Sequence, residues 1–332
     1  MNSFGRIFKV SIFGESHGEC VGITIDGCPA GLSLSPDDLL PDLERRKGGK
    51  QKGTTPRQEE DFPIFKSGIF NGKTTGFPIT ILFENKNIRS EDYTKQRSIP
   101  RPGHADWVAH QKFGGNEDYR GGGHFSARLT AGIVAAGGIA KKLMKDVSIH
   151  AEVVEIGGEK DLEKGLQKAI DAKDSVGGIL ECKVNGLPVG LGEPWFDSVE
   201  SSLAHLVFAI PAVRGVEFGT GFAAARMFGS EHNDAILEMG GKTKTNHAGG
   251  VVGGITNGNE LVFRLAIKPT SSTPKEQESL NWDTDQVEKF SIKGRHDLCV
   301  ALRAPVIVEA VTALVLVDFM ILEQKIPRII NP

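Results

Sequence analysis

The hydrophobic positions of the chain fall into short apolar runs and longer helical stripes, separated by glycine and polar residues. Short apolar or alternating runs predict β-strands, and stripes with a period near 3.6 residues predict helices. We predict strands at residues 10–13, 21–25, 78–83, 149–156 and 178–184. We predict helices at residues 35–47, 105–113, 126–144, 161–173, 197–208 and 304–323.

One tight turn is prominent in the second half of the chain. The apolar runs 250–255 and 261–267 flank Thr-Asn-Gly-Asn at residues 256–259. Asn-Gly between two such runs is the strongest short-range signal for a β-hairpin, so we predict that these runs pair. Strands and helices otherwise mix without a repeated βαβ unit, which favours a layered α+β fold over a doubly wound parallel sheet. We expect residues 1–332 to form a single domain, because the sequence has neither a linker nor an internal repeat.

Composition and charge limit the classes of function. The chain has 332 residues, 39% hydrophobic and 24% charged, which is typical of a globular protein. Its net charge of −3 gives no overall attraction to nucleic acid or to an anionic membrane, so an anion site requires a local cluster of cations. Polar residues interrupt the apolar run 304–322, and we interpret this run as a buried helix rather than a membrane span.

The compartment is inferred from the cysteines and the first residues. Four scattered cysteines whose spacings fit no zinc site are typical of a reducing compartment. Residues 1–9 lack the apolar segment of a signal peptide. We therefore expect a cytoplasmic protein with no metal site.

Glycine is abundant, with 41 residues, and it clusters in loops that also carry histidine or arginine. The first loop is Gly-Glu-Ser-His-Gly at residues 14–18, and the second is Arg-Pro-Gly-His-Ala-Asp at residues 101–106. The third, Tyr-Arg-Gly-Gly-Gly-His-Phe-Ser-Ala-Arg at residues 119–128, runs into a predicted helix. Backbone N–H groups at a helix N-terminus bind anions, and histidine exchanges protons near neutral pH.

Two further loops have the same character. Gly-Arg-His-Asp occupies residues 294–297 and is followed by Arg303, while Lys-Pro-Thr-Ser-Ser occupies residues 268–272. Each loop alone is also compatible with an ordinary polar turn, and Asp106 is compatible with a helix cap. Five such loops in one chain favour a shared site for phosphorylated anions.

Two nucleotide-binding motifs fail on inspection. Residues 68–74 place three residues between two glycines, whereas a P-loop requires four. Residues 219–224 satisfy G-x-G-x-x-A, but no βαβ unit surrounds them. We reject both motifs.

The motifs resemble, in the same order, those of the chorismate synthase family. They lie at residues 13–18, 101–106, 118–123, 246–250, 268–272 and 294–297. The resemblance runs from about residue 5 to about residue 318. It implies an anti-1,4-elimination of phosphate from 5-enolpyruvylshikimate 3-phosphate, which gives chorismate. It also implies reduced FMN as cofactor, without net redox change.

The resemblance further implies roles for individual residues. His17 would protonate the departing phosphate, and His104 would sit by flavin N1 and keep the reduced flavin a monoanion. Asp297 with Ser126 would help flavin N5 lose a proton, and Ser16 is also assigned to catalysis. Implied FMN contacts are His124, Phe125, Ser126, Ala212, Gly253, Lys268, Pro269, Thr270, Ser271, Ser272 and Arg295. Arg46, Arg128 and Arg303 would bind substrate, and Arg46 and Lys52 fall where the family contacts NADP.

The family fold implied by this resemblance is a β-α-β sandwich, a helical core between antiparallel sheets, assembled as a homotetramer. NADPH or an external flavin reductase would supply the reduced flavin. The chain departs from the family pattern at His124-Phe125, where Arg-Ser is usual, and at Lys52, where Arg is usual. Pro211 also replaces a polar residue.

Two alternatives remain open. The loops also suit a lyase or transferase that handles a phosphorylated substrate without flavin. A nucleotide-binding module without catalysis is the third possibility, supported only by the two near-miss motifs. Flavin titration distinguishes a flavin-free lyase or transferase from the flavoenzyme. Turnover of the enolpyruvyl substrate would exclude the nucleotide-binding module.

Overall fold

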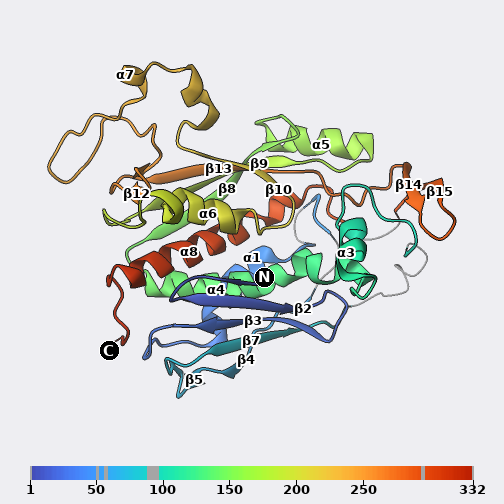
Figure 1. Ribbon diagram of the computed structural model, residues 1–332, viewed down its shortest axis with the longest axis horizontal. Helices are drawn as coiled ribbons and strands as arrows, with labels where there is room; N and C mark the ends of the chain where they lie inside the picture. The colour runs from blue at the N-terminus through green and yellow to red at the C-terminus, as the bar shows by residue number, and fades with distance from the viewer. Residues whose placement is uncertain (1, 50–51, 56–58, 88–96, 293–295, 331–332) are drawn as a thin grey trace.

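The computed structural model describes residues 2–49, 52–55, 59–87, 97–292 and 296–330. Two antiparallel sheets enclose a layer of helices (Figure 1). This arrangement confirms the predicted α+β class and matches the implied sandwich with a helical core.

The lower sheet in Figure 1 has the strand order β1-β2-β3-β7-β4. Its strands are β1 Ser3–Phe4, β2 Lys9–Gly14, β3 Cys20–Asp26, β4 Ile64–Ser67 and β7 Ile79–Glu84. Alternate residues of β7 face the helices, so Ile79, Ile81 and Phe83 are fully buried. The predicted strands at 10–13, 21–25 and 78–83 are confirmed.

The upper sheet has the order β10-β13-β9-β8. Its strands are β8 Ser148–Ile156, β9 Gly178–Asn185, β10 Val213–Phe218 and β13 Leu261–Ile267. The apolar face of β13 is buried at every second residue, at Leu261, Phe263, Leu265 and Ile267. Each sheet therefore turns one apolar face inward, and both faces need helices to cover them.

Two long helices, α4 Thr130–Leu143 and α8 Pro305–Leu322, fill the space between the sheets. Fourteen consecutive residues of α8, from Val306 to Phe319, are buried. The helix is long and apolar enough to cross a membrane, but most of it lies inside the protein, as expected for a core helix. Its two carboxylates have partners. Glu309 binds Arg45 and Lys141, and Asp318 accepts three backbone N–H groups near the N-terminus.

The remaining helices and strands surround this core. They are α1 Leu40–Arg46, α3 Asp106–Phe113, α5 Leu162–Ala172, α6 Val199–Val207, α7 Gly229–His232, η1 Pro36–Asp38, η2 Arg120–Phe125, η3 Ala127–Leu129, η4 Trp195–Asp197, η5 Gly221–Arg226, η6 Val300–Arg303, β5 Ile69–Phe70, β6 Lys73–Thr74, β11 Val251–Val252, β12 Ile255–Thr256, β14 Gln277–Asn281 and β15 Gln286–Phe290. All six predicted helices occur, although those at 35–47 and 126–144 begin with 3-10 turns.

The predicted hairpin around residues 256–259 is wrong. β11 pairs with β12, and the two strands are joined by Gly253-Gly254, both with positive φ. Two glycines of this kind form a two-residue turn at no steric cost, so β11 and β12 pair across Gly253-Gly254 and not across the Asn-Gly sequence. β13 instead pairs with β9 and β10 in the upper sheet.

A stability prediction follows from the contact between α4 and α8. A Cβ at Gly137 would lie 2.4 Å from Cβ and 2.5 Å from Cα of Ala310, so Gly137→Ala should push the helices apart. We expect a loss of about 1–3 kcal/mol in the free energy of unfolding, measured by urea denaturation. Gly138→Ala is the matched control. Its Cβ meets only the end of the Leu39 side chain at 3.0 Å, and alanine favours helix by about 0.5–1 kcal/mol. Equal losses in both variants would contradict the prediction.

Candidate active site

The glycine-rich loops meet at one end of the helical layer, around a cavity of about 190 Å³. The beginnings of α4 and α8 contribute to it, because Arg128 and Arg303 stand just before these helices. Predicted site residues that line the cavity are His17, Arg46, Ser126, Arg128, Thr270, Asp297 and Arg303. The structure thus brings together residues from four of the five loops and adds Arg101 from the fifth.

The triple glycine at residues 121–123 lies against two histidines, His17 and His104. Gly121, Gly122 and Gly123 all have positive φ, a conformation that side chains other than glycine rarely adopt. A Cβ at Gly121 would lie 2.0 Å from Nδ1 of His17, and one at Gly122 would lie 3.4 Å from Nε2 of His104. The backbone at Gly121 can approach His17 this closely only because it lacks a side chain, whereas a Cβ at Gly122 would make an ordinary contact with His104.

The three glycines precede the helix, as the sequence predicted, but the 3-10 turn η3 stands between them and α4. Ser126 is the N-cap of η3, and its Oγ accepts the N–H of Arg128 at 3.3 Å. The backbone N–H of Ser16 donates to the carbonyl of Gly123 at 3.1 Å. This bond joins the first glycine loop to the third and fixes the loop that carries the buried His17.

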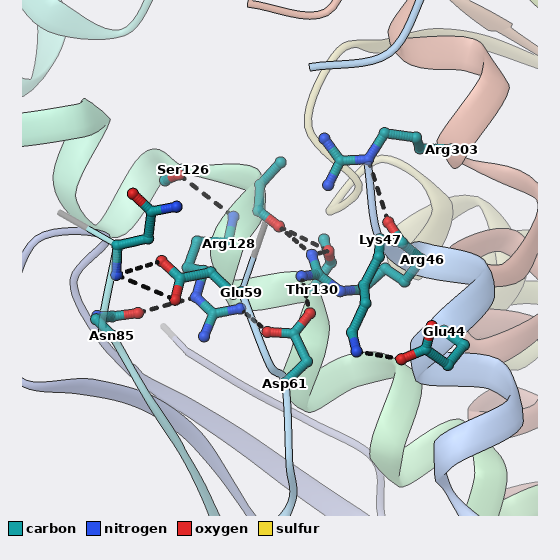
Figure 2. A network of polar contacts seen from close by, with 12 residues as sticks. Glu44, Arg46, Lys47, Glu59, Asp61, Asn85, Ser126, Arg128, Thr130 and Arg303 are labelled. Carbon is teal, nitrogen blue, oxygen red and sulfur yellow. Dashed lines mark hydrogen bonds and ion pairs between the residues drawn. The ribbon is translucent and has the colours of Figure 1, made fainter. Parts of the chain in front are cut away.

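Asp61 joins two arginines beneath the cavity (Figure 2). Its Oδ2 accepts from Nη2 of Arg46 at 2.7 Å, and its Oδ1 accepts from Nη1 of Arg128. Arg128 also donates from Nε to Oδ1 of Asn85 at 2.9 Å, and Arg46 donates to Thr130 at 3.2 Å. The three charged side chains are almost fully buried, so their geometry is fixed.

Burial and charge act in opposite directions on Asp61. Burial alone raises the pKa of its carboxyl group, but the neighbouring Arg46 and Arg128 outweigh burial and lower it below the usual range. Asp61 is therefore a carboxylate at neutral pH. It offsets part of the repulsion between the two guanidinium groups.

Asp297, which also lines the cavity, is held in a similar way. Its Oδ1 accepts the N–H of Thr55 at 2.8 Å, and its Oδ2 accepts from Nη1 of Arg303 at 3.0 Å. Arg303 also donates from Nε to the carbonyl of Arg46 at 3.1 Å (Figure 2). Burial lowers the pKa of Arg303, and the charge of Asp297 opposes that shift.

The second histidine lies in an adjoining cavity of about 40 Å³ that shares Arg101 with the first. His104 Nδ1 is 2.5 Å from Oδ1 of Asp106, and Arg101 contacts the same carboxylate through Nε at 2.7 Å. Burial alone raises the pKa of Asp106, but hydrogen bonds from Arg101 and His104 outweigh it, and the pKa lies far below its usual value. Asp106 therefore remains ionised.

The Lys-Pro-Thr-Ser-Ser loop is anchored beside these histidines. Lys268 Nζ donates to Oγ of Ser271 at 2.8 Å, and Ser271 Oγ donates to the carbonyl of Gly103 at 2.7 Å. Ser272 Oγ lies 3.4 Å from Nη1 of Arg101. Pro269 belongs to the same loop, and its carbonyl accepts from Lys268 at 3.2 Å. Of this loop, Thr270 reaches the larger cavity.

The larger cavity is electropositive. Five lining residues are cations, against three carboxylates, within a chain of net charge −3. His296 also lines it, and burial together with the nearby Arg101 lowers the pKa of this imidazole, which is therefore neutral at pH 7. The cations present are Arg46, Lys47, Arg101, Arg128 and Arg303. Such a cavity binds anions, and phosphates in particular.

Comparison with known proteins identifies the family. The family model described as Chorismate synthase matches residues 8–321. The chorismate synthase of Chitinophaga pinensis is 68% identical over 330 residues, covering 99% of each chain. The chain belongs to the chorismate synthase family. That of Methanocaldococcus jannaschii is 41% identical over 365 residues, covering 97% of this chain and 96% of the relative. A crystal structure of chorismate synthase superposes with a TM-score of 0.72 and 26% identity, covering 96% of this chain and 93% of that one.

Several residues implied by the family resemblance lie outside the larger cavity. Lys52 is exposed and donates to Gln167 of α5 at 3.2 Å. His124 donates from Nδ1 to the carbonyl of Gly14 at 2.9 Å, and Phe125 is 42% exposed and packs near Phe113. Ala212 accepts the N–H of Lys268 at 2.9 Å. Arg295 lies outside the described residues.

Gly253 is the most distant of the implied contacts. It is exposed in the turn between β11 and β12, at the opposite end of the molecule from α3 in Figure 1. The structure therefore does not bring it to the cavity of its own chain.

Sequence reasoning missed several lining residues. Asp61 and Glu59 lie in an irregular polar segment, and Asn87 lies just after β7 without any accompanying motif. His296 was within a recognised loop but received no role. The one signal for Asp61 was indirect, since buried arginines require a carboxylate partner.

A prediction about Asp61 follows from this ion triad. Asp61→Asn keeps the shape, and asparagine tolerates the positive φ of 51° at this position. It leaves two buried guanidinium groups unpaired, so we expect a loss of about 3–5 kcal/mol in unfolding free energy at pH 7. Because the folded pKa is lowered, this contribution is present above the unfolded pKa of about 3.9 and is lost as the pH falls through the folded pKa.

Urea denaturation across pH checks this prediction. The difference between wild type and Asp61→Asn should be largest near neutral pH and should shrink in acid. Glu159→Gln is the control, because Glu159 also bridges two cations, Lys164 and Lys168, but does so at the surface. It should change stability far less. A pH-independent loss in Asp61→Asn would contradict the electrostatic explanation.

Proposed function

We propose that the protein catalyses the anti-1,4-elimination of phosphate from 5-enolpyruvylshikimate 3-phosphate, which gives chorismate. This is the last common step of the shikimate pathway to the aromatic amino acids. The C3–O bond breaks, phosphate leaves, and C6 loses its hydrogen, so the enzyme is a carbon–oxygen lyase. The observation that carries the proposal is the cavity with five cations and His17 in a member of the chorismate synthase family.

The residues of the cavity fit FMN as cofactor. Three buried polar atoms have no partner among the described residues: Thr270 Oγ1, His296 Nε2 and Arg46 Nε. Buried polar atoms of this kind are normally hydrogen-bonded, so they indicate a ligand rich in polar atoms. Reduced FMN, when bound, supplies electron density that weakens the allylic C–O bond without net redox change.

The arginines are the proposed substrate contacts. Arg46, Arg128 and Arg303 line one cavity and are held by Asp61 and Asp297. Guanidinium groups that are already oriented bind phosphate and carboxylate without losing much side-chain freedom. This supports the assignment of the two anionic ends of the substrate to this wall.

His17 is the proposed acid. Its imidazole is buried, lines the cavity and lies against Gly121. A proton delivered to the departing phosphate oxygen makes the phosphate a better leaving group. Ser16 is fully buried beside His17 and is proposed to keep this loop in place.

Asp297 and Ser126 are the proposed proton acceptors, and both line the cavity. His104 is proposed to face the cofactor from the adjoining cavity, with the Lys268–Ser272 loop beside it. We also propose that residues 1–332 act as one catalytic unit, because one cluster of buried side chains runs through both sheets and the helices.

The assembly is proposed to be a cytoplasmic homotetramer. Large exposed apolar side chains gather between residues 195 and 239: Trp195, Phe196, Phe222, Phe228, Ile236 and Met239. The segment around α7 also projects beyond the upper sheet (Figure 1). Such a surface is typical of an interface between subunits. If Gly253 contacts flavin, it does so in another subunit's site, and a tetramer would permit this.

The reductant is proposed to be external, such as a flavin reductase, rather than NADPH bound to this chain. Lys52, one of the two implied NADP contacts, points to α5 and does not line the cavity. The other, Arg46, is committed to Asp61 and Thr130.

An anaerobic assay tests the function and the reductant together. With photoreduced FMN, the protein should release phosphate and chorismate from the enolpyruvyl substrate. With NADPH and oxidised FMN, it should give no turnover. Turnover in both arms would contradict the external reductant. Absence of turnover in both arms, with FMN binding retained, would remove the proposed function.

His17→Ala tests the acid. We expect kcat to fall by about 10²–10⁴-fold, because general acid catalysis typically contributes that much. FMN binding, followed by fluorescence titration, should change little. His150→Ala is the control, since this histidine lies on β8 in the upper sheet, away from the cavity. Wild-type turnover in His17→Ala would disprove the assigned role.

A further inference from the structure

Asp106 begins helix α3 but does not cap it. The N-cap is Ala105, and no side chain caps the helix. The carboxylate of Asp106 turns back instead, and it accepts the backbone N–H of Arg101 at 3.0 Å. It also accepts from Nε of Arg101 at 2.7 Å and from Nη2 at 2.8 Å, and it meets Nδ1 of His104 at 2.5 Å. The interpretation of Asp106 as a helix cap is therefore wrong.

These contacts determine which ring nitrogen of His104 carries a proton. Two groups approach Nδ1: the carboxylate of Asp106 at 2.5 Å and Nη2 of Arg101 at 3.0 Å. An ionised carboxylate can only accept, so contact with it requires a proton on Nδ1. A bare Nδ1 would place two lone pairs against each other at the shorter distance. The Nη2 group of Arg101 already donates to Asp106, so it does not need Nδ1 as an acceptor.

The other ring nitrogen lies beside a residue that lines the small cavity. The edge of His104 formed by Cε1 and Nε2 lies against Gly122, where an added Cβ would be 3.4 Å from both atoms. Gly122 lines the same small cavity as His104. Nε2 is thus the ring atom placed for a hydrogen bond or a proton exchange with a bound molecule.

We propose that Asp106, clamped by Arg101, is a positioning residue that keeps Nδ1 of His104 protonated and turns Nε2 toward the cofactor. This inference rests on the proposed function for the identity of that cofactor. The arrangement follows the logic of a carboxylate that orients a histidine by binding its second nitrogen. Arg101 makes the orientation rigid, because its two bonds to the carboxylate fix the plane of Asp106.

Arg101, which holds Asp106, also connects the small cavity with the larger one. It lines both cavities, and its Nη1 lies 3.4 Å from Oγ of Ser272. The side chain is 9% exposed, so it is fixed in place between the two sites. The low pKa of Asp106, for which hydrogen bonds from Arg101 and His104 outweigh burial, ensures that the carboxylate is present whenever the protein is folded at neutral pH.

The wild-type protein provides the first test. Solid-state ¹⁵N NMR of protein labelled at histidine, with His104→Gln to assign the signal, reports the protonation of each ring nitrogen. We expect a protonated Nδ1 at His104. A bare Nδ1 with the proton on Nε2 would overturn the proposal. This measurement requires neither cofactor nor substrate, so its outcome is independent of the proposed function.

Asp106→Asn provides the second test. The amide no longer requires a proton on Nδ1, so we expect kcat to fall by about 10²-fold or more, with a much smaller change in KM. The absorbance of bound reduced FMN should shift in the same direction as in His104→Ala. Glu217→Gln is the control, because Glu217 pairs with Arg264 at 2.8 Å in the upper sheet and lines neither cavity. This control should leave the flavin absorbance unchanged.

The outcomes separate the two hypotheses. Wild-type absorbance and kcat in a folded Asp106→Asn protein would overturn the positioning role. If this variant does not fold, the wild-type NMR measurement decides alone. If the wild type shows a protonated Nδ1 but no turnover of the enolpyruvyl substrate, the positioning role stands and the proposed function fails.

Discussion

The buried contact of Asp61 with Arg46 and Arg128 determines how the site is built. Two guanidinium groups in a nonpolar interior repel each other, and each is costly to remove from water. One carboxylate between them reduces both costs and joins the end of α1 to the turn before α4. Through Asn85, the same triad reaches the end of β7. The lower sheet and the helical layer are therefore connected through charges that also face the cavity.

The position of these arginines relative to the helices strengthens the positive electrostatic potential in the cavity. Arg128 and Arg303 immediately precede α4 and α8, so the positive ends of two buried helix dipoles point toward the cavity. The two helices approach each other closely in the core, at the contact of Gly137 with Ala310. The anion site thus depends on core packing as well as on its own side chains. A change that separates α4 from α8 would also displace the arginines at their ends.

Strands and helices with a clear hydrophobic pattern could be predicted from the sequence, but the pairing between strands could not. The strand at 78–83 and the buried helix at 304–323 have strong patterns, so their existence and type were confirmed. β10 was missed because its sequence, with glycine and charged residues, has no clear alternation. β14 and β15 are similarly polar. The hairpin prediction was wrong because the turn forms at Gly253-Gly254, where both residues have the positive φ that such a turn requires.

In the candidate site, likewise, the loops could be predicted from the sequence but the contacts between their side chains could not. Glycine loops with histidine indicated where ligands approach, and His17, Ser126, Asp297 and three arginines do share a cavity. The partner of the arginines could not be predicted, because Asp61 is 67 positions from Arg128 and has no motif around it. Asp106 illustrates a second limit. Local sequence suggested a helix cap, whereas the carboxylate is used by Arg101 and His104.

Four aspartates line the two cavities. Asp118 pairs with its neighbour Arg120, and the contacts of the other three distinguish which one can exchange a proton with a ligand. Asp61 has a fully buried side chain, and both of its oxygens face arginine. Both oxygens of Asp106 are engaged by Arg101, and one also by His104. Asp297 lines the larger cavity with its side chain 14% exposed, and among the described residues its Oδ2 accepts from Arg303 alone. Asp61 is fully buried and each oxygen of Asp106 already has two contacts, so Asp297 is the one of these three that is partly exposed and has an oxygen that can accept a second hydrogen bond. Its proposed role as proton acceptor therefore has a geometric basis that is independent of its place in a sequence motif.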